Sequence, residues 1–476
     1  MKKTLGLLAV ASLICAAPAG ATEWTALGPR ALGMGGAGVA LAQGPIASYW
    51  NPAALGRATE NSYGFQLPVT GHAGLTGSVY EGAKDLSDLQ NACAAGDATK
   101  CTQGNLLAAL DKLNQPGDGL RADIGAGANF KIGKLALFAD GFLDMGAIPR
   151  ADTTHVATTD FGTNPNNTSK LIVKGARVLE FGAGYGHELP FARGVYLGGN
   201  LKLMQAQVGY ADYAIFQNNN NQTNIVDNLK NGAKTSATFG VDLGALWDVN
   251  RTFASVPLHP RLGLVGRNLN NPKFKQADAA VADGVTGKFA MNPQVRAGLS
   301  LSPFHWWNLA ADLDLTRNLT PVDNVASRQL GVGTEINVFN RSWINIPLRV
   351  GLSRNLAETG SGTMIGAGAG LNFLHFMIDV SGSVSPKRID TQSVGQSKKI
   401  PRELAAAVQI SLLFGGSEDN APAETPADAP PAAPAAAPAP AAPAAAQTPT
   451  PAQTEKVKAD AEKAQQELDK TAAPAK

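Results

Sequence analysis

The feature that most constrains this chain is the alternation of apolar and polar residues along Asn61–Phe414. In segments of about ten residues, apolar side chains such as Leu201 and Leu203 take turns with polar ones such as Asn200 and Lys202. A period of two residues is the pattern of a β-strand and not of a helix. The alternation predicts about fourteen strands, near residues 62–79, 121–132, 134–148, 176–188, 194–210, 235–249, 259–268, 293–302, 306–317, 327–340, 345–355, 363–373, 375–385 and 402–414.

The lengths of the connections indicate which solvent the apolar phase faces, because a soluble β-sandwich would also alternate. Long connections, such as 81–120 and 149–175, take turns with short ones, such as Gly133 and 189–193. Short turns at one end, long loops at the other and an even strand number are typical of outer-membrane barrels. The sequence therefore predicts an all-β fold, in which 61–414 form a transmembrane antiparallel β-barrel of about 14 strands.

The polar phase of these strands carries charges of both signs, and in a barrel that phase faces the lumen. A register slip of one residue would move the charges into lipid, at a cost of up to roughly 2–4 kcal/mol each near the midplane. Two roles remain open for them: cross-strand ion pairs that also hold an internal plug, or a substrate path. The lumen-facing charges expected from the alternation are Asp242, Arg261, Arg296, Asp312, Asp314, Glu335 and Arg349.

The first 21 residues have the pattern of a secretory signal peptide. Lys2 and Lys3 precede an apolar run over Leu5–Ala17, and Ala19–Ala21 end it with small residues. No later apolar run approaches the roughly 18–20 residues of a spanning helix, which excludes an α-helical membrane protein. We therefore expect residues 1–21 to be removed on export.

Residues 22–60 follow as a glycine-rich segment that suits neither a strand nor a good helix. Glycine lets backbone lie close to other backbone and adopt positive φ, so the segment is predicted to form a compact plug, the hatch. A pattern search would find a dinucleotide fingerprint in its glycines, but that motif needs a buried strand before it, where this chain has its leader. The hatch motif residues are Arg30, Gly33, Gly35, Gly36, Gly38, Asn51, Pro52 and Ala53.

These motifs resemble those of a known superfamily. Arg30, Leu32–Gly36, Gly38–Ala40 and Asn51–Ala53 match the hatch of the FadL-type outer-membrane barrels position by position. Three late strands match as well, at Leu309–Thr316, Gln329–Glu335 and Leu348–Leu352. Within that superfamily the chain is most similar to the TraF-like conjugal transfer proteins, with FadL fatty-acid transporters and PorV-type secretion shuttles as related branches.

The resemblance implies two classes of function. One is a component or accessory of a conjugal transfer or secretion apparatus that binds other proteins through its loops and tail. The alternative is a FadL-like channel or carrier for hydrophobic small molecules, which a lipid-facing opening beside the hatch would favour. In both cases the expected location is the outer membrane of a Gram-negative bacterium, in contact with its lipid.

The composition changes abruptly after Phe414, the aromatic residue that closes the last strand. Residues 415–450 are almost wholly Ala and Pro, which predicts an extended, disordered linker, and 451–476 form a charged, helix-permissive tail. An even strand number places both ends of the barrel chain on the periplasmic side. We therefore expect the tail to hang in the periplasm, where a partner is one hypothesis and a solvated extension the other.

The sequence lacks the patterns of catalysis and of cofactor binding. Its six histidines are scattered, no CxxC or nucleophile-elbow motif occurs, and the net charge of +2 includes no basic run for nucleic acid. We expect no enzyme activity, metal, cofactor or nucleic-acid partner. Cys93 and Cys101 lie eight positions apart in a long loop of an exported chain, so a local disulfide is expected.

Overall fold

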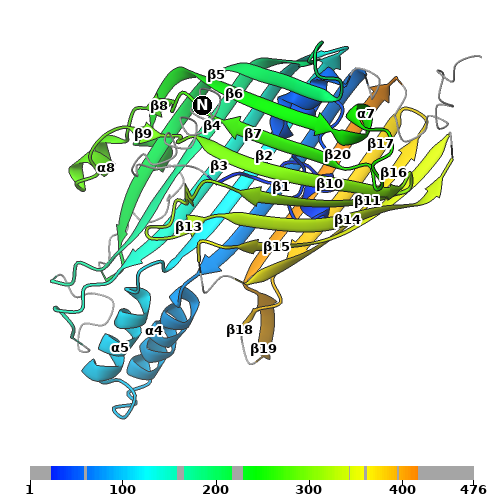
Figure 1. Ribbon diagram of the computed structural model, residues 1–476. Helices are drawn as coiled ribbons and strands as arrows, with labels where there is room; N and C mark the ends of the chain where they lie inside the picture. Colours follow the sequence, from blue (N-terminus) through cyan, green and yellow to red (C-terminus); the bar gives the residue numbers. More distant parts are fainter. Residues whose placement is uncertain are drawn as a thin grey trace, which may run out of the picture. The chain divides into compact units, whose positions relative to one another are not determined.

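The alternating segments form fourteen antiparallel strands, and these close into a barrel where β20 pairs with β1 (Figure 1). The structure is a computed structural model that describes residues 23–57, 62–157, 166–216, 229–341, 343–358, 362–393 and 396–415. All of these residues belong to one compact unit, Met1–Pro422. The second unit, Ala423–Lys476, contains none of the described residues. The expected signal peptide, the charged tail and nearly all of the Ala/Pro linker also lie outside the described residues.

The predicted barrel is confirmed strand by strand, because each observed strand lies within a few residues of a predicted one. The strands that form the barrel are β1 (Tyr63–Thr76), β2 (Gly119–Ile132), β3 (Leu135–Arg150), β4 (Lys170–Glu188), β5 (Val195–Ala214), β6 (Lys234–Asp248), β7 (Arg261–Arg267), β10 (Gln294–Phe304), β11 (Trp307–Asp314), β14 (Gln329–Asn340), β15 (Ile344–Asn355), β16 (Thr363–Phe373), β17 (Phe376–Val384) and β20 (Glu403–Phe414). β20 ends at the aromatic residue expected to close the last strand.

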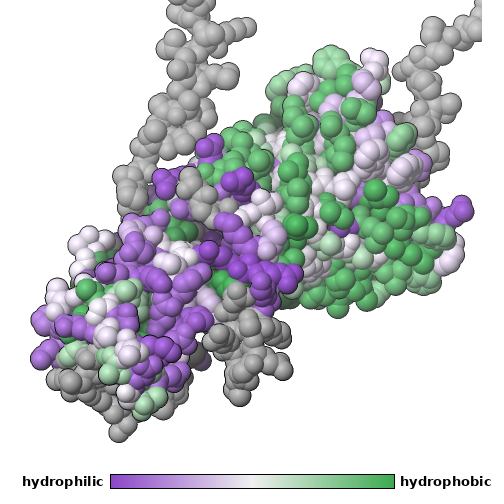
Figure 2. All heavy atoms as spheres, turned by 90° about the horizontal axis from the view of Figure 1, so that it is seen from below, coloured by the Kyte–Doolittle hydropathy of each residue, from purple (hydrophilic) through white to green (hydrophobic). Residues whose placement is uncertain are grey.

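The two faces of the wall differ as the alternation requires. Leu201 is 64% exposed on the outside, whereas its neighbour Lys202 is 1% exposed in the lumen. Figure 2 shows apolar side chains over the barrel wall and hydrophilic ones over the end with the long connections. Exposed aromatic side chains gather near the short turns, as in an interfacial belt: Tyr63, Tyr185, Phe253, Phe304, Trp306, Trp343, Phe373, Phe376 and Phe414.

The connection between β1 and β2 contains two helices where the sequence predicted only a long loop. These are α4 (Val79–Ala94) and α5 (Gln103–Leu113). A disulfide links Cys93 of α4 to Cys101, just before α5, and the two Cα atoms are 4.8 Å apart. Thr102 begins α5 by accepting a hydrogen bond from the Asn105 backbone N–H. The interpretation as a loop missed an apolar repeat of three and four residues in both helices.

The other connections hold short elements of two to six residues, too short to produce a detectable alternation. They are α7 (Val249–Thr252), β8 (Lys273–Phe274), α8 (Asp278–Ala282), β9 (Phe289–Ala290), β12 (Asn318–Leu319), β13 (Ala326–Ser327), β18 (Arg388–Ser393) and β19 (Gln396–Pro401). In three pairs, β8 with β9, β12 with β13 and β18 with β19, they form small sheets outside the barrel ladder. Among the described residues, none of the helices has the length and apolar character needed to cross a membrane.

The described part of the hatch lies inside the barrel and contains three single-turn elements. They are α2 (Pro29–Gly33), α3 (Ala47–Trp50) and the 3₁₀ turn η2 (Pro52–Gly56). Prolines occupy the first turns of α2 and η2, where the missing N–H costs nothing because that donor has no partner within the helix. The sequence predicted a compact plug but not these turns, which are too short for an apolar period.

Candidate functional site

The hatch has an aromatic core of its own. Trp24 stacks on Trp50 with ring centroids 6.4 Å apart, and Tyr49 meets both rings edge-on. Two arginines from the wall cover this cluster: the Arg267 guanidinium lies 4.2 Å from the Tyr49 ring centroid, and that of Arg296 lies 4.6 Å from Trp24. These cation–π contacts join the hatch to β7 and β10.

Glycines on the lumen face of the wall let the hatch backbone rest directly on the strands. A Cβ at Gly331 would lie 2.1 Å from the Gly35 carbonyl oxygen, and one at Gly351 would lie 2.2 Å from the Gly35 nitrogen. Gly35 itself has φ of +70°, and a Cβ there would lie 2.2 Å from the Leu352 carbonyl oxygen. Glycine is required on both surfaces at this contact.

The second close contact is the hatch corner, which we define as Asn51, Pro52 and Ala53. The Asn51 amide donates to the Ala245 carbonyl of β6 at 3.0 Å, and its oxygen accepts from the Ala53 N–H at 3.1 Å. The corner therefore begins η2 and bonds to the wall through one side chain. Gly198 lies beneath it, where a Cβ would come within 2.3 Å of the Pro52 carbonyl oxygen.

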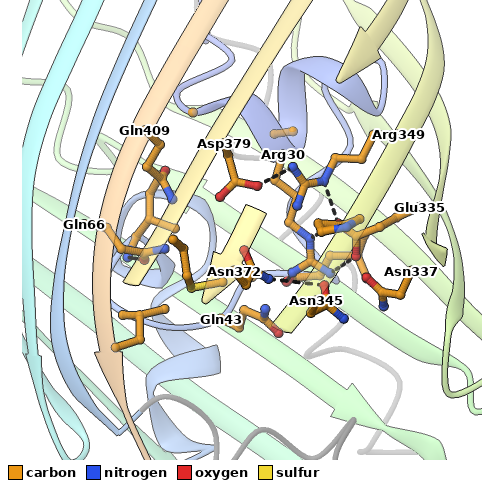
Figure 3. Close-up of a pocket in the computed structure, with 18 of the residues that line it drawn as sticks. Arg30, Gln43, Gln66, Glu335, Asn337, Asn345, Arg349, Asn372, Asp379 and Gln409 are labelled. Carbon is orange, nitrogen blue, oxygen red and sulfur yellow. Dashed lines mark hydrogen bonds and ion pairs between the residues drawn. The ribbon is translucent and has the colours of Figure 1, made fainter. Parts of the chain in front are cut away.

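Ion pairs hold α2 to the opposite side of the lumen (Figure 3). Arg30 forms a two-pronged contact with Glu335 of β14, with N–O distances of 3.0 and 2.6 Å. Arg349 of β15 bonds the same carboxylate at 2.6 Å and Asp379 of β17 at 2.6 Å. We call these four residues the latch. Two arginines face two carboxylates, so the buried charges compensate one another.

A third group of charges fastens the glycine-rich turn after α2. The Asp312 carboxylate of β11 accepts hydrogen bonds from the N–H groups of Gly38 and Val39 at 2.8 and 2.9 Å. Next to it, Arg296 pairs with Asp314 at 2.6 Å. A Cβ at Gly38 would lie 2.6 Å from the Trp50 ring, so only glycine fits at this turn.

The remaining predicted charges lie elsewhere. Asp242 pairs with Lys202 at 3.1 Å, and Lys202 in turn pairs with Glu180 at 3.0 Å, in a buried group on β4, β5 and β6. Arg261 lies apart from all of these, paired with Asp248 at 3.4 Å near the short turns. Gly33 and Gly36 belong to the turn of α2, and the cysteine pair lies outside the lumen.

Sequence reasoning missed Asp379 and Glu180, although both carry the signal that found the others. Asp379 alternates with Ile378 and Val380, and Glu180 with Leu179 and Phe181, within segments already predicted as strands. The alternation predicts which face of the barrel wall a side chain occupies but not which residue it contacts. For that reason the partner of Arg30, which lies 305 positions away, could not be predicted.

Helix α2 separates two hollow regions of the lumen. On the side of the short turns lies a cavity of 540 Å³, the short-turn chamber, which Arg30 and Ala31 help to line. Toward the long connections lie two cavities of 110 and 330 Å³ that share His72, Arg121 and Glu403 in their linings. Leu32 of α2 faces the smaller one. A solute crossing the lumen between these cavities would have to displace α2.

The chemistry of the lumen is that of ion pairs and amides. Among the described residues, no group of three or more His, Cys, Asp or Glu side chains is arranged to hold a metal ion. What the arrangement can do is hold α2 against the wall or release it, because the four latch residues all line the short-turn chamber.

Comparisons with known proteins concern the fold and the family. Solved structures with a similar fold include the Pseudomonas putida toluene transporter TodX, with 11% sequence identity, 83% of this chain and 100% of that chain covered and a TM-score of 0.46. The Ralstonia pickettii toluene transporter TbuX gives 13% identity, coverage of 81% and 98%, and a TM-score of 0.44. A Pseudomonas aeruginosa FadL homologue gives 12%, 83% and 100%, and 0.45.

No curated protein sequence matches the chain. The family described as "F plasmid transfer operon, TraF, protein" matches residues 48–314, which is more than half of the chain. That match begins within α3 of the hatch, includes the hatch corner and runs to Asp314 at the end of β11. The resemblance expected from the hatch and the late strands is thereby confirmed, and the chain belongs to the TraF family of the F plasmid transfer operon.

Proposed function

We propose that the protein is an outer-membrane β-barrel of a Gram-negative bacterium that serves, without catalysis, as a component or accessory of a conjugal transfer or secretion apparatus. Membership of the TraF family supports this role. In the proposal, the short turns face the periplasm and the long connections face outward, as in outer-membrane barrels generally. The C-terminal extension then leaves the barrel on the periplasmic side, because Phe414 pairs with Tyr63 beside the short turns.

The observation that carries the proposal is the folded platform at the end with the long connections. Leu89 of α4 and Leu106 of α5 are buried against each other and against Phe216 from the connection after β5. The disulfide joins α4 to the segment just before α5, and Lys112 of α5 pairs with Asp85 of α4. A folded surface built from several connections suits protein binding, for which mobile loops would lose conformational entropy.

In the connection after β3, the described residues 151–157 and 166–169 are also joined by hydrogen bonds. The Asp152 carboxylate accepts hydrogen bonds from the Thr154 hydroxyl at 2.6 Å and from the Thr168 N–H at 3.0 Å. The hydrogen bond from Thr154 leads the set of bonds that hold the pKa of Asp152 well below its usual range. Because the pKa is lowered, this carboxylate contributes its full stabilisation of the connection at pH values above the ordinary Asp pKa. The contribution is lost as the pH falls through the lowered pKa.

The test removes the platform and keeps the barrel. Thr76 of β1 lies opposite Gly119 of β2, so a tight turn can replace residues 77–118. The shortened protein should still insert and remain heat-modifiable on gels, whereas conjugal transfer or secretion by the native host should be lost. The variant with Cys93→Ser and Cys101→Ser, which keeps both helices, serves as the milder comparison. Unimpaired transfer by the shortened protein would contradict the proposal.

A second candidate, the carrier of a hydrophobic small molecule, is favoured by one stretch of the wall. The ladder between β6 and β7 ends at the pair Leu243 and Gly266. Beyond it, Asn270 closes the wall with its side chain, accepting from the Val241 N–H at 3.0 Å and donating to the Phe239 carbonyl at 2.8 Å.

Beside the buried charges of Lys202 and Asp242, the lumen face near this discontinuity has an apolar part, which is unusual for a barrel interior. Val178 and Met204 are buried there beneath Phe274 and Met291 of the connection after β7. An apolar solute entering between β6 and β7 would meet this surface if the connection moved.

Asn270→Ala tests the second candidate. The change removes both side-chain bonds that close the wall, so uptake of the apolar dye 1-N-phenylnaphthylamine by proteoliposomes should rise. Asn250→Ala, at the short-turn end, loses one bond to the Val256 carbonyl and is the matched control. Equal uptake by the two variants and by the wild type would count against the hydrophobic carrier.

A further inference from the structure

We infer that the short-turn chamber is a binding site for an uncharged oligosaccharide. Its volume of 540 Å³ falls within the roughly 300–1,000 Å³ of small-molecule sites. It opens toward the short turns, because Arg341, Trp343 and His375 of those turns line it. Beside apolar side chains such as Leu41, Ile46 and Met377, its lining contains seven amide side chains from the hatch and from five strands: Gln43, Gln66, Asn337, Asn340, Asn345, Asn372 and Gln409. Figure 3 labels all of these amides except Asn340.

Three of these amides form a ladder across neighbouring strands. The Asn372 amide of β16 donates to the Asn345 oxygen of β15 at 3.3 Å, and the Asn345 amide donates to the Asn340 oxygen of β14 at 3.1 Å. An irregularity in the β14 register between Asn337 and Phe339 lets both Asn337 and Asn340 line the chamber. Bulges of this kind re-aim side chains at functional sites.

The amides keep unused hydrogen-bonding capacity. Each has two N–H donors and an oxygen with two lone pairs, and a ladder contact uses only part of this. Within the described residues, the side-chain amides of Gln43 and Asn337 form no hydrogen bond to another residue. A ligand in the chamber would therefore meet donors and acceptors side by side.

The charged side chains deep in the chamber form ion pairs with one another. Arg30 and Arg349 pair with Glu335, and Arg349 pairs also with Asp379. The further arginine, Arg341, lies at the mouth with its guanidinium 5.9 Å from the Phe339 ring centroid. A charged ligand would find no unmatched counter-charge deep in the chamber, which favours a neutral one.

The same lining selects a sugar over the other neutral ligands. Sugar hydroxyls both donate and accept, as the amides do, whereas an apolar molecule would leave the amides without partners at a cost. An extended peptide is recognised best at a free strand edge, and this wall offers none because β14 to β17 and β20 are paired on both sides. Trp343 is 51% exposed and lines the mouth, where its flat apolar ring suits the C–H face of a sugar ring.

The test measures binding of chitotriose and maltotriose, two neutral oligosaccharides, to the purified full-length protein by calorimetry. We expect saturable binding of at least one of them. The double variant with Asn345→Ala and Asn372→Ala loses two ladder amides, so its affinity should fall about tenfold or more. Asn345→Asp keeps the size of the side chain and places a negative charge in the ladder, so it should weaken binding too.

The matched control is Asn355→Ala, since Asn355 lies on the same strand as Asn345 but at the opposite end of β15. Its affinity should equal that of the wild type. The inference is overturned if the folded wild type binds neither sugar, if trialanine or trigalacturonate binds more tightly than both, or if Asn355→Ala weakens binding as much as the ladder variants. The measurement uses purified protein alone, so its result is independent of the transfer assay.

Discussion

Two of the attachments that hold the hatch to the barrel wall, the hatch corner and the latch, differ in kind. At the hatch corner, backbone rests on wall glycines with no room for a Cβ, and none of the cavities described above is lined by Asn51, Pro52 or Ala53. At the latch, Arg30 reaches the wall through two hydrogen bonds, and cavities border α2 on both of its sides.

The difference indicates which part of the hatch can move. Close packing resists displacement steeply, since the contacts have no adjacent space to move into. An ion pair beside a cavity can exchange its partner for water at small cost. We therefore expect the hatch corner to act as a fixed anchor and α2 as the part that is released when the latch breaks.

The largest effect should come from Arg349→Met, which removes the wall half of the latch. Arg349 is 5% exposed and bonds both Glu335 and Asp379, so its loss leaves Asp379 buried without that partner. Breaking a buried pair in this way costs about 3–5 kcal/mol. On gels, the folded form of the variant should convert to the unfolded form at a clearly lower temperature than the folded form of the wild type. An unchanged transition would mean that water already screens the latch.

A smaller loss is expected from Gly198→Ala, which tests whether the hatch corner is fixed by packing. The added Cβ would lie 2.3 Å from the Pro52 carbonyl oxygen, so either the corner or β5 must shift. Overpacking of this kind costs about 1–3 kcal/mol. The matched control is Gly71→Ala in β1, where no atom lies within 4 Å of the new Cβ. Equal thermal transitions of the two variants would show that the corner is not tightly packed.

Asn51→Ala tests the one side chain that bonds the corner to the wall. The variant loses the hydrogen bonds to the Ala245 carbonyl and from the Ala53 N–H, which together contribute about 1–2 kcal/mol. Ion conductance in planar bilayers should rise only slightly, because the glycine contacts remain. A conductance as large as that of a latch variant would reverse the assignment of anchor and latch.

The strands and their faces could be predicted from the sequence because lipid enforces a strict alternation. Asp312 and Glu335 were placed in the lumen for that reason alone. Their partners could not be predicted, since Gly38 and Arg30 lie in a segment without an apolar period and far away in the chain. The helices α4 and α5 could not be predicted from the alternation because they lie outside it, and their apolar repeat is short.

The same limit applies to the cavities, which depend on how the hatch fills the lumen. The alternation places Asn345 and Asn372 on the polar phase of their strands, but only the paired register aligns them in a ladder. The irregularity that redirects Asn340 breaks the period of two residues, so a pattern search would assign that side chain to the wrong face. Sites built from such irregularities are the least predictable from sequence.

The smallest effect on stability, and the largest on permeability, should come from Arg30→Ala. The Arg30 side chain is 24% exposed to the short-turn chamber, and Glu335 keeps Arg349 as its partner when Arg30 is lost. Solvent screening limits the stability cost to about 1 kcal/mol or less. The temperature at which the folded form unfolds on gels should therefore stay close to that of the wild type. Arg30→Ala removes the bonds to Glu335 and to the Leu41 carbonyl, and among the described residues no other side chain of α2 forms a hydrogen bond to β14. Conductance in planar bilayers should then exceed that of both the wild type and Asn51→Ala. Arg30→Lys, which keeps the charge but not the two-pronged contact, should give an intermediate value. If Arg30→Ala is as closed as the wild type while its barrel is intact, the glycine contacts of Gly35 hold α2 by themselves, and the hatch is a permanent plug.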